Sequence, residues 1–209
     1  GGDSQALGDH AERGSYDTGL ANDVVRPGGT LRQEFDEDLS WMFGYRLPII
    51  AAVNGSVAGV SFALACFCDL RFGSAPAKIT TAAPKLGLPA EYGLSWTLPR
   101  LIGTTRAADL LLSGRVVTVA ESAYWGLWNE VLPDGEATLD AAVAYGHLLA
   151  TTTGPRAVSH AKRQLHEDVL RGDPAASVAE SKELLDTAMG TDEYREGIAA
   201  FLQRRPPKF

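Results

Sequence analysis

Cysteine is scarce in this chain, and the two residues that occur limit its chemistry. Among the 209 residues, cysteine appears only at Cys66 and Cys68. Side chains two apart point to different faces of a helix, which disfavours both a disulfide and a CxxC metal site. Free cysteines fit a reducing compartment, so we expect a cytoplasmic protein without a bound metal ion.

Basic residues are outnumbered, and no long basic run occurs. The formal net charge is −7, which argues against a general nucleic-acid binder. Apolar residues make up 45% of the chain and charged residues 22%, as in ordinary soluble proteins. The length suits one domain with a substantial hydrophobic core.

One long stretch, residues 47–68, has no charged side chain and approaches the length of a transmembrane helix. Pro48 and the pair Asn54-Gly55 lie inside it and argue against a membrane span. They divide the stretch into a buried strand at 49–53, a turn at 54–59 and a helix over 60–68. At the start of that helix, unpaired backbone N–H groups would favour a developing negative charge.

The remaining chain predicts an α/β core followed by helices. Polar residues 3–30 indicate a mobile loop, residues 31–45 have helical spacing, 69–73 suggests a second strand, and 74–94 is loop-like. Thr118 and Glu121 have capping-box spacing, and Thr138 is a candidate N-cap. A further strand is expected at 127–131, and helices are expected at 105–113, 118–125, 138–151, 155–171, 174–189 and 191–204.

Several motifs occur in an order that resembles the crotonase, or enoyl-CoA hydratase/isomerase, superfamily. LPIIAAVNG at 47–55 is similar to the family's strand motif, GVS at 59–61 stands at its GGG, and Cys68-Asp69 stands at its CD or SD. Later landmarks are LPRLIG at 98–103, LSGR at 112–115, GLWNEVLP at 126–133 and DEYREGIAAF at 192–201. The resemblance covers nearly the whole chain and implies a β-β-α spiral core with a C-terminal helical trimerisation region.

The resemblance also implies an oxyanion hole for the oxygen of an acyl-CoA thioester. Gly1-Gly2-Asp3 is similar to the end of the family's AGxD motif, so the backbone N–H of Gly2 would be one donor. The N–H of Val60, at the centre of the GGG position, would be the other. Each well-placed donor contributes about 3–4 kcal/mol to transition-state stabilisation. Residues that precede AGxD in the family, about a quarter of the fold, would be absent from this chain.

The two glutamates of the family's hydratases are missing. Their positions hold Ala63 and Ala83, and alanine cannot transfer a proton. These alanines would line the substrate pocket instead, together with Tyr92. The loss argues against ordinary two-glutamate hydration of a 2-enoyl-CoA.

A carboxylate does occur nearby, at Glu91. Several relatives carry an Asp at this place, so the resemblance implies that Glu91 is the general acid/base. Partial burial would raise the pKa of its carboxyl toward a useful range. The alternative is that Glu91 only stabilises the N-terminus of a helix over residues 92–98 through the helix dipole.

Other polar residues are weaker candidates. Ser61 lacks a nucleophile frame, and His147, His160 and His166 are expected to be solvated or packed. Arg204, Arg205 and Lys208 form a basic C-terminus that could contact CoA phosphates of a neighbouring subunit; a solvated tail is the alternative.

We therefore expect an α/β core at residues 1–135 and a helical region at 136–209 that assembles as a homotrimer or homohexamer. The expected function is double-bond isomerisation of an acyl-CoA, with neither nucleic acid nor membrane as a partner. Coenzyme A would belong to the substrate, with no other cofactor. The alternative is a catalytically silent acyl-CoA-binding or assembly subunit.

Overall fold

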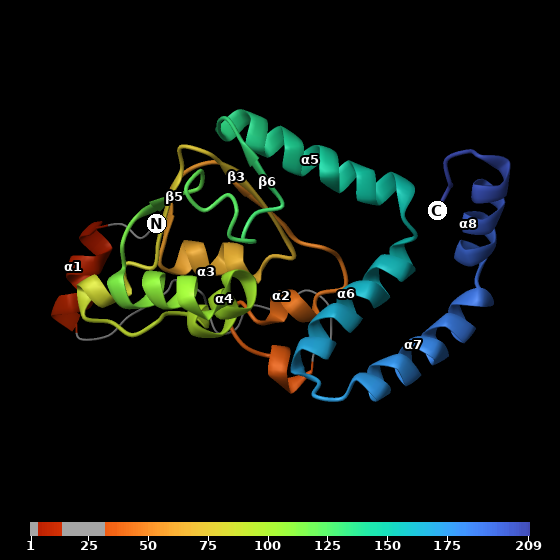
Figure 1. Ribbon diagram of the computed structural model, residues 1–209, viewed down its shortest axis with the longest axis horizontal. Helices are drawn as coiled ribbons and strands as arrows, with labels where there is room; N and C mark the ends of the chain where they lie inside the picture. Colours follow the sequence, from red (N-terminus) through yellow and green to blue (C-terminus); the bar gives the residue numbers. More distant parts are fainter. Residues whose placement is uncertain (1–3, 14–31) are drawn as a thin grey trace.

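Two small sheets lie at the centre of the computed structural model, which describes residues 4–13 and 32–209 (Figure 1). The first sheet has the order β1-β3-β6, with all strands parallel. Its strands are β1 (Ile50–Val53), β3 (Leu70–Ser74) and β6 (Glu130–Leu132). The second sheet has the order β2-β4-β5, with β4 and β5 antiparallel. Its strands are β2 (Val57–Ala58), β4 (Lys78–Thr80) and β5 (Val117–Thr118).

The chain alternates between these sheets in two β-β-α turns. The first turn runs through β1, β2 and α3 (Val60–Phe67), and the second through β3, β4 and α4 (Leu94–Ser113). The alternation confirms the α/β core expected from the sequence. It also brings α3 and α4 side by side, and their buried side chains include Phe62, Leu94 and Leu98.

Four helices complete the chain. α5 (Gly135–Thr152) packs on β1 and β3, and α6 (Pro155–Leu170) follows it. α7 (Pro174–Met189) and α8 (Asp192–Gln203) extend away from the sheets (Figure 1). The chain from the start of α5 onward is therefore mainly helical. Within the described residues, no helix is both long enough and apolar enough to cross a membrane.

The N-terminal part differs from the expectation. Residues 4–13 of the expected loop form α1 (Ser4–Arg13), and the rest of that loop lies outside the described residues. Instead of one helix over 31–45, the structure has η1 (Gln33–Phe35) and the short α2 (Trp41–Gly44). Leu39 separates them with a φ of 61°, a conformation that interrupts a right-handed helix, while its side chain is buried.

Two local predictions after residue 73 were wrong. The expected loop at 74–94 contains β4 and η2 (Ala83–Leu86). The expected helix at 118–125 is a series of turns, because Thr118 pairs with Lys78 in the second sheet. The Thr118 hydroxyl still accepts a hydrogen bond from the Glu121 N–H, as a cap would.

Helix boundaries were also shifted in two places. α4 begins at Leu94 rather than at residue 105, and it continues past a kink at Gly103 to the expected stop at Gly114. The N-cap of α5 is Asp134, whose carboxylate accepts from the Ala137 N–H. Thr138 lies inside the helix and donates to the Asp134 carbonyl.

Candidate active site

The Glu91 carboxylate lies against the start of α3. A Cβ added to Gly59 would lie 2.8 Å from Glu91 Oε2, so the carboxylate occupies the space beside the Gly59 Cα. Gly59 has a φ of 54° and a ψ of −124° and immediately precedes the first helical residue, Val60. Only glycine combines this backbone conformation with room for the carboxylate.

Val60 presents a backbone N–H at the same place. As the first residue of α3, it has no helical acceptor for this group. No described residue accepts a hydrogen bond from it either. The N–H is therefore available to an oxygen atom beside Glu91. Gly2, the second expected donor, lies outside the described residues.

Burial raises the pKa of the Glu91 carboxyl, because desolvation penalises the ionised form. The side chain does not cap α4. The N-cap of that helix is Gly93, with no side-chain hydrogen bond, and only the Glu91 backbone carbonyl accepts from the Leu94 N–H. The carboxylate thus lies beside the start of α3 and makes no capping hydrogen bond to α4.

The three expected pocket residues divide into two groups. Ala63 and Ala83 are fully buried, in α3 and at the start of η2. Tyr92 is half-buried, has a φ of 44°, and lines a cavity of about 580 Å³. Only the Tyr92 side chain therefore borders open space in this structure.

The basic C-terminus is partly engaged within the chain. Arg205 makes two bonds to the Glu196 carboxylate, at 2.6 and 2.9 Å, and these hold the pKa of Glu196 at about 2. The Lys208 N–H also donates to Glu196, and Arg204 ends α8 in a left-handed conformation. This end of the molecule lies away from α3 and α4 (Figure 1). The three residues are therefore not brought to this chain's own Glu91.

Sequence reasoning missed a buried polar cluster around Asp69. One carboxylate oxygen binds Lys162 Nζ at 2.7 Å and accepts from the Ile49 N–H, while the other binds His166 Nε2 at 2.7 Å. Desolvation opposes ionisation here, but these hydrogen bonds outweigh it and lower the pKa of Asp69. The cluster fastens α6 to the start of β1. The Cys68-Asp69 motif was a signal for it, but no spacing rule links position 69 to α6.

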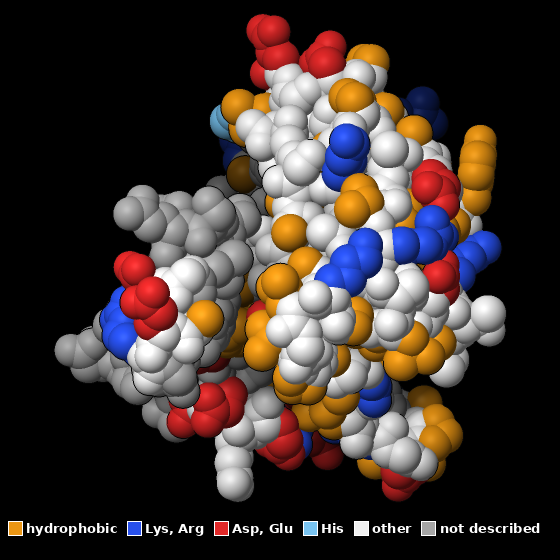
Figure 2. Space-filling view, turned by 90° about the vertical axis from the view of Figure 1, so that its left-hand side faces the viewer, with side chains coloured by type: hydrophobic (Ala, Val, Ile, Leu, Met, Phe, Trp, Pro, Cys, Tyr) orange, Lys and Arg blue, Asp and Glu red, His pale blue; other side chains and the backbone are white. Residues whose placement is uncertain are grey.

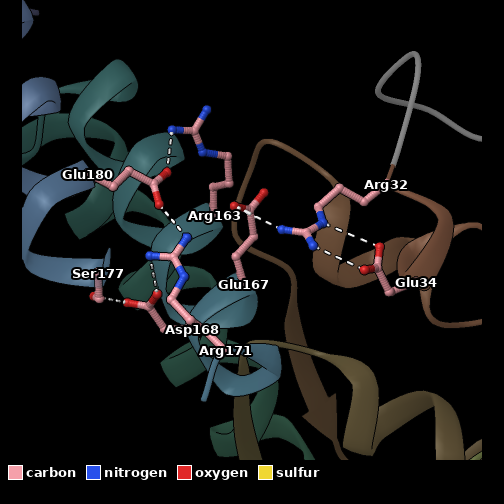
Figure 3. A network of polar contacts seen from close by, with 8 residues as sticks. All are labelled: Arg32, Glu34, Arg163, Glu167, Asp168, Arg171, Ser177 and Glu180. Atoms are coloured by element: carbon pink, nitrogen blue, oxygen red, sulfur yellow. Dashed lines mark hydrogen bonds and ion pairs between the residues drawn. The ribbon is translucent and has the colours of Figure 1, made fainter. Parts of the chain in front are cut away.

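His166 is packed, as expected, with its ring stacked on Phe43 at 4.2 Å. A second set of ion pairs fixes α6 and α7 around the same side of the fold (Figure 3). Arg32 bridges Glu34 and Glu167, and Arg171 binds Glu180 at 2.5 Å. The Arg32–Glu167 pair joins α6 to the segment that contains η1, and the Arg171–Glu180 pair joins the end of α6 to α7.

The described residues contain no cluster of three or more His, Cys, Asp or Glu side chains that could hold a metal ion.

Figure 2 shows Lys and Arg side chains among hydrophobic ones on one face of the molecule. Two arginines near the C-terminal end of α4, Arg106 and Arg115, lie by the Trp125 ring. Arg115 is already paired with Asp109 and Glu121, so its charge is largely compensated.

Comparison with known proteins places this geometry in a family. The model of the enoyl-CoA hydratase/isomerase family matches residues 16–209. The chain belongs to the enoyl-CoA hydratase/isomerase family. Its crotonase-like fold agrees with a solved enoyl-CoA hydratase/isomerase from Mycobacterium abscessus, described as probable. That structure has a TM-score of 0.78 and 30% identity, with 93% of this chain and 73% of the other covered.

Curated members of the enoyl-CoA hydratase/isomerase family carry different names. A probable enoyl-CoA hydratase of Rhodobacter capsulatus is 32% identical, over 86% of this chain and 68% of its own length. The 1,2-epoxyphenylacetyl-CoA isomerase of Escherichia coli is 34% identical, over 78% of this chain and 61% of its own length. The chain thus spans about two thirds of these relatives.

Proposed function

We propose that this protein isomerises a double bond in an acyl-CoA thioester, with Glu91 as the only proton carrier. The observation that carries the proposal is the position of the Glu91 carboxylate beside Gly59 and the Val60 N–H. A group that removes a proton next to a thioester carbonyl must lie close to the donor that stabilises the enolate oxygen. Both hydratase positions, Ala63 and Ala83, hold side chains that cannot transfer a proton.

In the proposed reaction, the substrate is a 3-enoyl-CoA. Ionised Glu91 removes a proton from C2, and the electron pair of that C–H bond forms a dienolate whose oxygen accepts from the Val60 N–H. Gly2 is proposed as the second donor. Protonated Glu91 then returns the proton to C4, giving the 2-enoyl-CoA. One carboxylate suffices, because no water is added. Coenzyme A is part of the substrate, and no other cofactor takes part.

The direct test is the Glu91→Gln variant, with Glu130→Gln as the matched control. Glu130 is an exposed glutamate on β6. Loss of a general acid/base lowers the rate by about 10²–10⁴-fold. We expect that loss of 3-enoyl-CoA isomerisation in Glu91→Gln and normal activity in the control. Full activity of Glu91→Gln would remove Glu91 from the mechanism.

The rival function is a catalytically silent acyl-CoA-binding or assembly subunit, and the alanines at both glutamate positions favour it. Binding of acyl-CoA without turnover of either 2-enoyl or 3-enoyl substrates would support this function. Hydration of a 2-enoyl-CoA at the rate of isomerisation would instead show that a second proton carrier exists.

Assembly into a homotrimer or homohexamer is part of the proposal, as is a cytoplasmic location. α7 has no buried side chain, although it carries Val178, Leu185 and Met189. On α8, Phe201 and Leu202 are 79% and 74% exposed. Such apolar surface favours association between chains. In an assembly, Arg204, Arg205 and Lys208 would be able to reach the CoA of a neighbouring chain.

A further inference from the structure

The cavity beside Tyr92 has an unusual lining. It holds about 580 Å³, and five aromatic side chains border it. They are Phe35, Phe43, Phe67, Tyr92 and Trp96. Four different parts of the chain supply these rings: η1, α2, α3, and the first turn of α4 together with the residues just before it. The fold therefore gathers aromatic residues at one place that the sequence spreads over more than sixty positions.

The segment 91–93 links the cavity to the proposed reacting end. Tyr92 follows Glu91 directly, so one of two adjacent residues carries the carboxylate and the other forms part of the cavity wall. Phe67 ends α3, seven residues or about 10 Å along the helix from Val60. Its ring lies against Gly93, where a Cβ would be 3.1 Å from Phe67 Cζ. An acyl group whose carbonyl oxygen meets the Val60 N–H could thus extend into the cavity.

The rings are arranged around Phe43 with tilted and edge-on contacts. Phe67 lies 4.9 Å from it and Trp96 lies 5.8 Å from it, both tilted, while Phe35 makes an edge contact at 6.3 Å. Aromatic pairs favour such offset and edge-to-face geometries. His166 stacks behind Phe43 and is itself held by Asp69. The central ring is therefore positioned before any ligand arrives.

Charge at the mouth limits the acyl group further. Glu34, Glu37 and Asp38 border the cavity, and no Lys or Arg is among its described lining residues. Glu34 is already paired with Arg32, so the rim does not require a cation from the ligand. Its carboxylates still repel an anionic group. An acyl group that ends in a carboxylate would meet like charges here.

We infer that the acyl group of the substrate carries an aromatic ring, which binds among these five side chains. The inference rests on the proposed function only for the position of the thioester. A straight alkyl chain would bury apolar area in the cavity but would make no edge-to-face or offset aromatic contacts with the rings. An aryl group of the same size gains additional contacts with Phe43 and Trp96.

Binding of three saturated thioesters tests the inference without requiring any turnover. 5-Phenylpentanoyl-CoA and 5-cyclohexylpentanoyl-CoA have the same number of acyl carbons and nearly the same shape, and undecanoyl-CoA is the straight-chain equivalent. By calorimetry, we expect the phenyl compound to bind about 2- to 10-fold more tightly than the cyclohexyl compound. Equal or weaker binding of the phenyl compound would overturn the inference.

Two variants locate the effect. Trp96→Leu and Phe43→Leu should bring the phenyl-to-cyclohexyl ratio close to one. Tyr124→Leu should keep it, because the Tyr124 ring is 95% exposed and does not line the cavity. Melting temperatures check that each variant is folded. A preserved ratio in both folded cavity variants would place the ring elsewhere and contradict the inference.

The outcomes separate this inference from the proposed function. A phenyl preference in a protein that isomerises nothing supports the aromatic site and removes the function. Isomerisation of a straight-chain 3-enoyl-CoA without phenyl preference keeps the function and removes the aromatic site. Failure to bind any of the three thioesters contradicts the inference, whereas the function is judged by isomerisation of a 3-enoyl-CoA.

Discussion

The carboxylate of Glu91 occupies the space that a side chain on Gly59 would need. This relationship joins two segments more than thirty residues apart, the turn before α3 and the loop before α4. The backbone conformation of Gly59 therefore affects the proton transfer proposed for Glu91.

Gly59→Ala should therefore impair both stability and catalysis. The new Cβ would lie 2.8 Å from Glu91 Oε2, and the positive φ adds backbone strain of about 1–3 kcal/mol. We expect at least a 10-fold lower kcat/KM for 3-enoyl-CoA and a lower melting temperature. Gly55→Ala is the control, since a Cβ there meets nothing within 4 Å. A Gly59→Ala protein with normal activity would show that the carboxylate position is unimportant.

The pH profile of kcat/KM should report Glu91. Burial raises the pKa of this carboxyl above the ordinary value of about 4.3, and the base must be ionised to act. We expect activity to decline on the acidic side with a pKa above that value, and this limb should vanish in Glu91→Gln.

The raised pKa of Glu91 also predicts how ionisation of this carboxyl affects the stability of the fold. A carboxyl with a raised pKa binds its proton more tightly in the folded state, so its ionised form destabilises the fold above that pKa. Glu91→Gln should accordingly melt at the same or a higher temperature near neutral pH. A clear decrease would indicate a structural role for the charge.

Lys162→Met should destabilise the protein strongly. Lys162 and Asp69 are only 5% and 9% exposed, and removal of one partner leaves a buried charge. We expect a loss of about 3–5 kcal/mol in the free energy of unfolding, measured by urea denaturation. Arg195→Met, which removes an exposed pair with Asp192, should cost less than about 1 kcal/mol. Similar losses in the two variants would contradict the buried role of Lys162.

Charged substitutions on α8 should weaken the proposed assembly. Phe201→Glu combined with Leu202→Glu places two charges on exposed apolar positions. We expect a smaller mass by light scattering, whereas Leu112→Glu on α4, at 80% exposure, should leave the mass unchanged. If the double variant keeps the wild-type mass, the interface lies elsewhere.

The sequence predicted those elements whose signals are local. Gly114 stops α4 where expected, with a left-handed φ of 56°, and Thr191 caps α8 through its hydroxyl. Pro155 and Pro174 begin α6 and α7, as proline favours the first helical turn. In residues 47–68, β1 and α3 also follow from local proline, asparagine and glycine, whereas the expected turn at 54–59 contains β2, which pairs with β4.

Elements that depend on distant partners could not be predicted. Thr118 has a capping pattern, yet pairing with Lys78 draws it into a strand. Asp69 reaches Lys162 and His166 across more than ninety positions, and nothing local to residue 69 indicates these partners. At the candidate site, Glu91 was chosen by resemblance, while its approach to Gly59 is a tertiary fact. The aromatic cavity was missed for the same reason.

The two cysteines provide a way to time the opening of α3. Desolvation raises the pKa of Cys66 to about 12 and that of Cys68 to about 11, so in the closed fold neither thiol is an effective nucleophile. Because these are the only thiols in the chain, and both are buried, slow reaction with a thiol reagent would report exposure of the C-terminal end of α3 to solvent. The rate at which a thiol reagent labels the unmodified protein therefore measures local unfolding of the helix that begins at the proposed oxyanion site. This rate can be compared with and without a bound acyl-CoA.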